Sequence, residues 1–181
     1  SAGDAAMSER VPMRPSGRAA LEAELKRLKY VERPRIVKEI EIARAHGDIS
    51  ENAEFEAAKE RQGQIEMRIA IVEDRLARAQ VIDASGQTAQ AVRFGATVEL
   101  TDTDSGDIVT YTIVGEDESD AANGLISVTS PIARALLGKP VDEVVAVQVP
   151  RGRREFEIRR IRFEYSGSRV ANGPSSERPF D

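Results

Sequence analysis

The sequence of 181 residues contains no cysteine, no tryptophan and only one histidine, His46. The lack of cysteine excludes a disulfide framework and the usual structural zinc sites, and it suits a reducing compartment. His46 has no second histidine or cysteine with which to complete a metal site or a Ser/His/Asp triad. Its position beside a predicted turn favours stabilisation of a helix end. A self-contained catalytic site therefore has little support in the sequence.

Long hydrophobic runs are absent as well. No apolar stretch approaches the ~18 residues of a membrane-spanning helix, and the opening segment SAGDAAMSER lacks the apolar core of a signal peptide. Neither a P-loop nor a GxGxxG fingerprint occurs. We expect a soluble, cytoplasmic protein.

Positive charge is not in excess. The net charge of −5 argues against a protein that coats nucleic acid nonspecifically. Residues 17–80 hold 13 Lys/Arg and 13 Asp/Glu, so the acidic excess lies outside this region. Any contact with nucleic acid would therefore need a local basic patch.

The first half of the chain carries two helical hydrophobic stripes. After Ser16, a predicted N-cap, the first stripe recurs in steps of three and four: Leu21, Leu25, Leu28, Glu32, Ile36, Ile40 and Ala43. After Gly47 the second stripe has the a/d spacing of a coiled coil: Phe55, Ala58, Gln62, Ile65, Ile69, Val72, Leu76 and Ala79. Residues 16–82 are therefore predicted to form an antiparallel coiled-coil hairpin with arms of about 45 Å, although half of a helical bundle would show the same stripes.

Pro34 interrupts the first stripe. Three successive steps of four surround this proline, one residue more than a heptad allows. Because proline removes a backbone donor and clashes with the preceding turn, we expect a kink or a phase shift there.

From residue 83 the periodicity shortens to two. Strands are predicted at ATVEL, DIVTYTIVG, GLISVTS, DEVVAVQVP and REFEIRRIRFEY, and a short helix at PIARALLGK. Residues 83–165 are therefore expected to form a small, largely antiparallel α+β domain. Residues 1–15 and 166–181 have the composition of a disordered leader and tail.

Acidic residues surround the predicted turn between the arms. Asp48 followed by Glu51 is close to a capping box, in which both side chains satisfy backbone N–H groups at the start of the second helix. Residues three apart on a helix also have Cβ atoms about 5–6 Å apart, so the same pair could approach one Mg²⁺ from one side. Spacing alone favours the cap, because caps are common and acidic metal-binding tips are rare.

Several motifs together resemble a known family. The segments EIARAHGDISENAEFEAAKERQG, VID, FGATVEL, YTIVGEDESD and LISVTSPIARALLGK are closely similar to bacterial transcript-cleavage factors of the GreA type. The resemblance covers residues 10–165 and both predicted domains. Phe55 stands where the family often has tyrosine, and Lys59 where it often has arginine. The acidic total and modest basic patch favour the GreA type over the more basic GreB type.

The resemblance implies a coiled-coil hairpin followed by an FKBP-like globular domain. The globular domain would dock at the rim of the RNA polymerase secondary channel, and the hairpin would enter the channel. There it would stimulate the polymerase's own hydrolysis of backtracked RNA. The protein would thus be an accessory factor rather than an enzyme, and we expect a monomer.

The functional residues of the family carry over to numbered positions here. Asp48 and Glu51 would hold a second Mg²⁺ shared with the polymerase active site, with none tightly bound to the free protein, and would orient a water molecule. Asn52 would orient water or RNA, and Arg44 and Lys59 would contact the 3′ end of the extruded RNA. The structural alternatives are helix-turn packing for Asn52 and exposed ion pairs for the two basic residues.

The segment SPIARALLGK resembles the polymerase-docking segment of the family. The residues that would dock are Ser130, Pro131, Ile132, Ala133 and Arg134. Alternatively, Ile132, Leu136 and Leu137 only close the domain core. Both readings can hold, because opposite faces of one short helix can do different work.

Two other functions fit parts of the sequence. A channel-binding paralogue that inhibits polymerase would share the architecture and differ at the tip, so Asp48 and Glu51 favour activation. A coiled-coil adaptor with no polymerase role would fit the hairpin but leave the other motifs unexplained. An RNA-cleavage assay on stalled complexes separates activation, inhibition and no effect.

Overall fold

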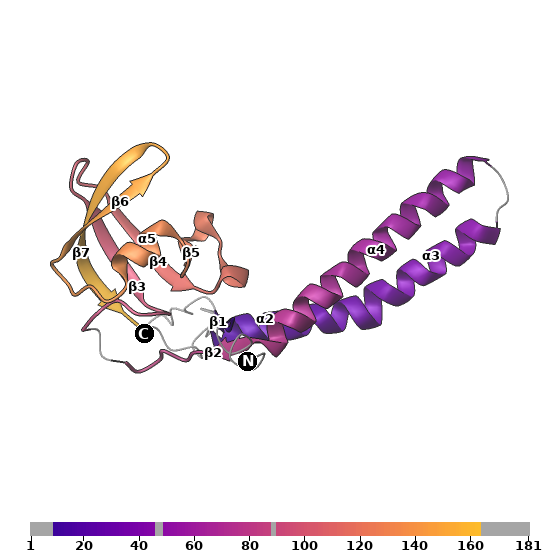
Figure 1. The fold of residues 1–181 in the computed structure, drawn as a ribbon, viewed down its shortest axis with the longest axis horizontal. Helices are drawn as coiled ribbons and strands as arrows, with labels where there is room; N and C mark the ends of the chain where they lie inside the picture. The colour runs from indigo at the N-terminus through magenta and orange to yellow at the C-terminus, as the bar shows by residue number, and fades with distance from the viewer. Residues whose placement is uncertain (1–8, 46–48, 88–89, 164–181) are drawn as a thin grey trace, which may run out of the picture.

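The computed structural model describes residues 9–45, 49–87 and 90–163. Figure 1 shows a curled sheet with one helix, and two long helices that extend side by side away from this globular domain. The predicted class, α+β with an N-terminal helical hairpin, is confirmed.

Two helical arms build the hairpin. The first arm comprises α2 (Pro15–Arg27), η1 (Leu28–Glu32) and α3 (Arg33–Ala45), and the second arm is α4 (Ile49–Ala77). Every member of the two predicted hydrophobic stripes is buried or half-buried, although the last one, Ala79, lies beyond the end of α4 in a short strand. The helical period therefore predicted the inward faces of both arms correctly. The predicted N-cap, Ser16, is wrong by two residues: α2 begins at Pro15, Ser16 lies inside the helix, and the N-cap residue is Arg14, which makes no side-chain cap.

The η1 segment is a π-helical turn immediately before Pro34. The Arg33 N–H donates to the carbonyl of Leu28, five residues back instead of four. Pro34 has no N–H with which to bond the carbonyl of Tyr30, and the wider turn takes up one extra residue at this point. The predicted phase shift at Pro34 is confirmed.

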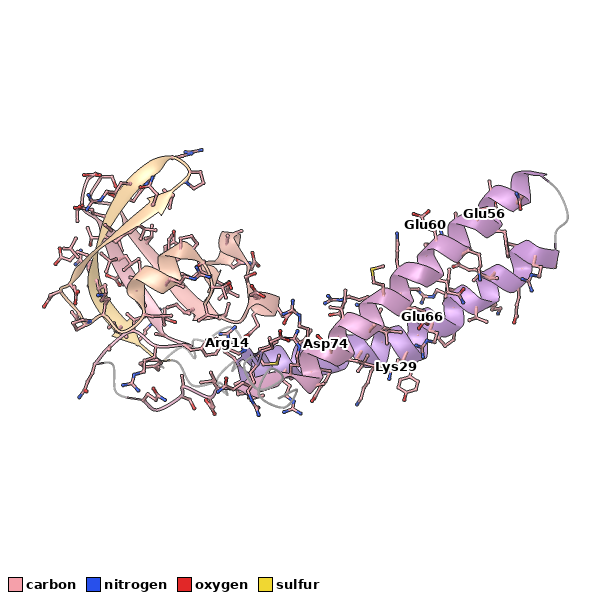
Figure 2. All side chains as sticks on the ribbon, in the orientation of Figure 1. Arg14, Lys29, Glu56, Glu60, Glu66 and Asp74 are labelled. Carbon is pink, nitrogen blue, oxygen red and sulfur yellow. The ribbon has the colours of Figure 1, made fainter. Side chains whose placement is uncertain are left out.

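Ion pairs between the arms define their register, and Figure 2 labels one member of each of the two pairs described here, Lys29 and Glu66. Arg33 donates from Nε and Nη2 to the two carboxylate oxygens of Glu66 at 2.7 and 2.8 Å, and Lys29 Nζ lies 2.8 Å from Glu73. Residue numbers rise along the first arm as they fall along the second, so the arms run in opposite directions. The hydrogen bonds from Arg33 lower the pKa of Glu66. None of the helices in the described part of the chain is both long enough and apolar enough to cross a membrane.

A two-stranded parallel sheet closes the base of the hairpin, where β1 (Val11–Met13) pairs with β2 (Ala79–Val81). Residues 11–13, which we expected in a disordered leader, form a strand instead. Their pairing partner lies far away in the sequence, and three residues are too few to show a period. The side chain of Met13 is 1% exposed and packs in a small core with Val11, Leu21 and Val72.

The globular domain contains a five-stranded sheet in the order β5-β4-β3-β7-β6. The strands are β3 (Thr97–Asp102), β4 (Ile108–Val114), β5 (Leu125–Ser127), β6 (Val144–Val149) and β7 (Gly152–Arg162). Each lies within or overlaps a predicted strand segment. The sheet is mixed, however, and not antiparallel throughout, because β5 pairs parallel to β4. The connection through the 3-10 turns η2 (Glu116–Glu118) and η3 (Ala121–Asn123) carries the chain back before β5 begins.

Helix α5 (Pro131–Leu136) closes the core of this domain. Its Ala133 and Leu136 are completely buried and join a hydrophobic cluster that includes Val98, Leu100 and Ile158 from the sheet. The predicted short helix is therefore present, and its inward face belongs to the core.

Candidate functional site

The tip of the hairpin lies where α3 ends at Ala45 and α4 begins at Ile49. Asp48 lies outside the described residues, as does the side chain of Glu51, although Glu51 belongs to α4. The capping and metal-binding hypotheses for this pair therefore stay predictions. Among the residues that are described, no three His, Cys, Asp or Glu side chains gather as a metal site.

Arg44 and Phe55 meet across the two arms close to the tip. The Arg44 guanidinium carbon lies 5.7 Å from the centroid of the Phe55 ring, within the range of a cation–π contact. Arg44 is exposed and Phe55 is half-buried. In general, a guanidinium group can contact a ring through its face while its in-plane N–H donors serve a phosphate.

Three residues of α4 share one face near this contact. Asn52, Phe55 and Lys59 follow one another in steps of three and four. Asn52 and Lys59 are exposed, and Lys59 Nζ donates to Gln62 Oε1 at 3.2 Å. Arg44 reaches the Phe55 ring from the other arm, and Asn52 and Lys59 occupy neighbouring positions on α4, three residues before and four residues after Phe55.

Phe55 is the residue of this cluster that sequence reasoning missed. The helical stripe identified Phe55 only as part of the seam between the arms. Its second role, as the ring under Arg44, depends on which residue of α3 lies opposite. The signals in the sequence were that an aromatic residue and an arginine flank the same predicted turn, and that the resembled family often has tyrosine at the position of Phe55.

The predicted docking segment is divided between surface and core. The Ser130 hydroxyl caps α5 by accepting a hydrogen bond from the Ala133 N–H at 3.3 Å, and Pro131 occupies the first turn. Pro131 and Arg134 are exposed, and Ser130 and Ile132 are half-buried. Ala133 is completely buried, so its side chain supports the segment from beneath and offers no surface to a partner.

The fold defines a class: a small two-domain protein, in which a compact α+β domain carries a long helical arm. Matches to family models identify the family. Residues 11–81 match the model for the N-terminal part of transcription elongation factors GreA and GreB, and residues 87–163 match the model for the C-terminal part. The chain belongs to the GreA/GreB family of transcription elongation factors.

Relatives resemble this chain over nearly their whole length. It is 57% identical over 155 residues to transcription elongation factor GreA of Anaeromyxobacter sp. (strain K), which covers 86% of this chain and 93% of the relative. It is 55% identical over 153 residues to GreA of Phenylobacterium zucineum (strain HLK1), which covers 84% and 98%. A crystal structure of GreA factor homolog 1 (Gfh1) of Thermus thermophilus is 29% identical, covers 85% of this chain and 99% of that chain, and has a TM-score of 0.40.

Proposed function

We propose that this protein binds RNA polymerase and stimulates the polymerase's own cleavage of the 3′ segment of RNA in backtracked, arrested complexes. One observation carries the proposal: both family models match in order, over residues 11–81 and 87–163. The 57% identity to a relative named transcription elongation factor GreA supports it.

The hairpin would be the part that enters the secondary channel of the polymerase. The 29 residues of α4 span about 43 Å at 1.5 Å per residue, which suits a reaching device. We propose that the seam between the arms is a coiled coil and that the globular domain is FKBP-like. In that arrangement the hairpin carries the chemistry and the globular domain carries the docking surface.

Asp48 and Glu51 would bind a Mg²⁺ ion shared with the polymerase active site. Their carboxylates are the oxygen ligands that this cation prefers, and one or two carboxylates are its usual protein contribution. When bound between both partners, the ion would stabilise charge at the scissile phosphodiester. Asp48 and Glu51 would also orient the attacking water, with Asn52 beside them.

Arg44 and Lys59 would bind the phosphates of the extruded RNA. The contact between Arg44 and Phe55 supports this role, because a guanidinium group held on a ring loses less freedom when it binds a phosphate. Lys59 would contribute a second positive charge from α4, on the other arm.

The exposed edge of α5 would dock on the polymerase. Pro131 and Arg134 provide exposed surface there, and Ser130 and Ile132 contribute in part. The buried Ala133 and Leu136 would hold this edge rigid against the sheet. We propose that the protein acts in the cytoplasm, as a monomer, and as an accessory factor without a complete active site of its own.

The test is to add the purified protein to a backtracked elongation complex, with and without Mg²⁺, and to follow the RNA 3′ end. Faster Mg²⁺-dependent cleavage than by polymerase alone is expected. Slower cleavage would instead indicate a channel-binding inhibitor, and no effect would contradict any role in the secondary channel.

A further inference from the structure

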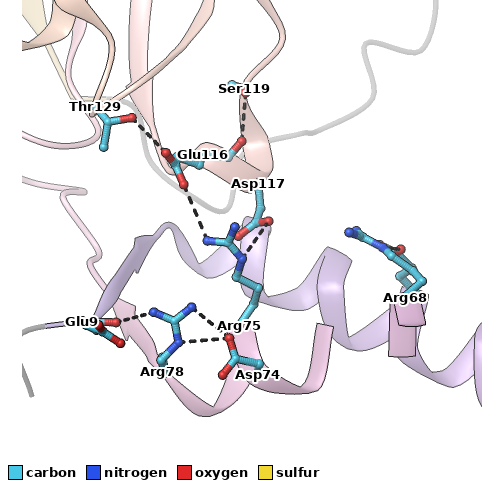
Figure 3. A network of polar contacts seen from close by, with 10 residues as sticks. Glu9, Arg68, Asp74, Arg75, Arg78, Glu116, Asp117, Ser119 and Thr129 are labelled. Atoms are coloured by element: carbon cyan, nitrogen blue, oxygen red, sulfur yellow. Dashed lines mark hydrogen bonds and ion pairs between the residues drawn. The ribbon is translucent and has the colours of Figure 1, made fainter. Parts of the chain in front are cut away.

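The acidic turn η2 of the globular domain lies against the base of the hairpin (Figure 3). Its three carboxylates face arginines at the base of the hairpin: Glu118 pairs with Arg14, directly before the first arm, whereas Glu116 and Asp117 face Arg75 of the second arm. This turn is the main polar connection that the described residues show between the two domains. None of the proposed functional residues belongs to it.

Glu118 forms the buried part of the connection. Its side chain is 8% exposed and accepts hydrogen bonds from the backbone N–H of Arg14 at 3.1 Å and from Arg14 Nε at 2.8 Å. It also accepts a bond from the N–H of Gly115 at 3.4 Å. Arg14 joins β1 to α2, so Glu118 holds the point from which the first arm starts.

Two glycines allow the domains to come this close. A Cβ atom on Gly115 would lie 2.3 Å from the carbonyl oxygen of Pro12, and one on Gly17 would lie 2.4 Å from Cδ of Glu118. Neither separation leaves room for a methyl group. The interface is therefore closely packed and not a chance approach of two surfaces.

Glu116 connects the second arm to the docking side of the globular domain. Its Oε2 lies 3.6 Å from Arg75 Nη1 on α4, and its Oε1 accepts a hydrogen bond from Thr129 Oγ1 at 3.1 Å. Thr129 directly precedes Ser130, which caps α5. One carboxylate thus bridges the base of the hairpin and the start of the proposed docking segment.

Small rotations at this base would move the tip far. With an arm of about 43 Å, a tilt of about 10° displaces the tip by about 7 Å. Catalytic groups must be placed to within about 1 Å, because a misplacement of that size can reduce the reaction rate by about a hundredfold. The orientation of the hairpin relative to the docking surface should therefore affect the cleavage rate. The ion pairs at this base are mostly solvent-exposed, so they contribute little to the free energy of unfolding.

We infer that Glu116 is a positioning residue, which holds the hairpin at a set angle to the docking segment by bridging Arg75 and Thr129. The inference rests on the proposed function. Glu116 and Arg75 would contact neither RNA, nor metal, nor the reacting atoms. They would affect cleavage only by placing the tip of the hairpin.

Distance measurements on the free protein test the positioning directly. The chain has no cysteine, so two spin labels can be attached at Glu60→Cys on α4 and Asp104→Cys in the globular domain, both exposed positions. The parent should give one narrow distribution of label-to-label distances. Glu116→Arg should broaden or shift it. The exchanged pair Glu116→Arg with Arg75→Glu should narrow it again when Asp117→Asn is added, because Asp117 also faces position 75 and would otherwise repel the new carboxylate. The inference would be overturned if Glu116→Arg gave the same distance distribution as the parent. It would also be overturned if the exchange failed to restore the parent's distribution.

Cleavage and binding assays supply the functional half of the test. Glu116→Arg should leave the Kd for polymerase within about twofold and lower the maximal cleavage rate at saturation by about tenfold or more, since misplacement reduces rate rather than docking. The exchanged pair with Asp117→Asn should recover most of that rate. Loss of docking in proportion to cleavage would contradict a positioning role.

Controls separate positioning from folding and from the proposed function itself. Glu39→Arg breaks a comparable exposed ion pair, with Arg61 at 2.7 Å within the hairpin, and should leave the label distances unchanged.

Thr129→Val removes the docking side of the bridge and should broaden the distances less than Glu116→Arg does. Glu116→Gln, the mildest change, keeps the test valid if the arginine variant fails to fold. If the parent itself stimulates no cleavage, the proposed function is wrong. The distance measurements would still test, independently of activity, whether Glu116 positions the hairpin.

Discussion

A single carboxylate at the hairpin tip, Asp48, has two proposed roles that one substitution separates. In Asp48→Asn the amide oxygen still caps a helix, whereas Asp48→Ala removes the cap and should lower the free energy of unfolding by about 1 kcal/mol. Asparagine lacks the anionic oxygen that Mg²⁺ prefers, so stimulated cleavage should collapse in both variants. Thermal unfolding, polymerase binding and cleavage rates check this, with Glu51→Gln as a companion. If Asp48→Asn cleaves like the parent, Asp48 is only a cap.

Arg44 and Lys59 should act on RNA rather than on polymerase. Replacing both by alanine should weaken the engagement of long backtracked RNA. The difference from the parent should shrink as the salt concentration rises, because the two side chains attract RNA phosphates. Phe55→Leu should give part of this defect by removing the ring under Arg44, whereas Phe55→Tyr should not. Cleavage rates against salt concentration provide the measurement. An equal loss of docking at every salt concentration would indicate damage to the hairpin instead.

Asp102 should make the globular domain sensitive to acid. It is 3% exposed and accepts bonds from Arg154 Nη1 at 2.7 Å and from the N–H groups of Asp104 and Ser105 at 2.9 and 3.2 Å. Arg154 first, and then the two N–H groups, lower the pKa of Asp102 below its ordinary 3.8. Because the folded-state pKa is the lower one, this stabilisation is fully present above the ordinary pKa and is lost as the pH falls through the folded-state pKa.

The measurement is thermal unfolding of the parent and of Asp102→Asn from neutral pH to below the ordinary carboxyl pKa. The variant should be less stable at neutral pH, and the difference should shrink in acid. Asp104→Asn, a change at an exposed neighbour, is the control. A difference that stays constant with pH would show that the ionised form of Asp102 contributes nothing.

At the scale of elements, the two faces of α5 should have different roles, with the exposed face in docking and the buried face in folding. Arg134→Ala changes only its exposed side and should weaken polymerase binding while altering the free energy of unfolding by less than about 0.5 kcal/mol. Leu136→Ala opens a cavity in the core and should cost about 2–5 kcal/mol. Binding affinity and thermal unfolding are compared for the two variants. Unchanged binding by Arg134→Ala would remove Arg134 from the docking surface.

The π-turn at η1 shows how an element tolerates a proline within a long arm. The inward stripe continues on both sides of Pro34, with Leu28 and Ile36 buried before and after it. The extra residue in the turn keeps these side chains on the seam although the α-helical bond is missing. The arm therefore remains one continuous structural element.

At the scale of the whole molecule, the chemistry is expected only in the complex. Incubation of RNA with the purified protein and Mg²⁺ should give no cleavage, because two carboxylates cannot fill the octahedral shell of the ion or position a substrate. Addition of polymerase in a backtracked complex should restore cleavage. Magnesium-dependent cleavage of free RNA by clean protein would refute the accessory role.

The sequence by itself determined the inward faces of the arms, the places of the strands in the globular domain and the short helix before Gly138. These features follow from local spacing: a period near 3.6 brings Leu21 or Val72 to one side of a helix, and a period of two does the same for a strand. The resemblance of the motifs also led to the family, which the matches over residues 11–81 and 87–163 show.

Only the tertiary structure decided which distant segments meet. Three contacts join segments whose partners no local pattern specifies: the pairing of β1 with β2, the parallel addition of β5 to β4 and the cation–π contact between Arg44 and Phe55. The bond from Arg14 to Glu118 spans 104 positions in the chain. Such contacts depend on how whole elements pack, because burial of the stripes and faces sets the arrangement first and the individual polar pairs form within it.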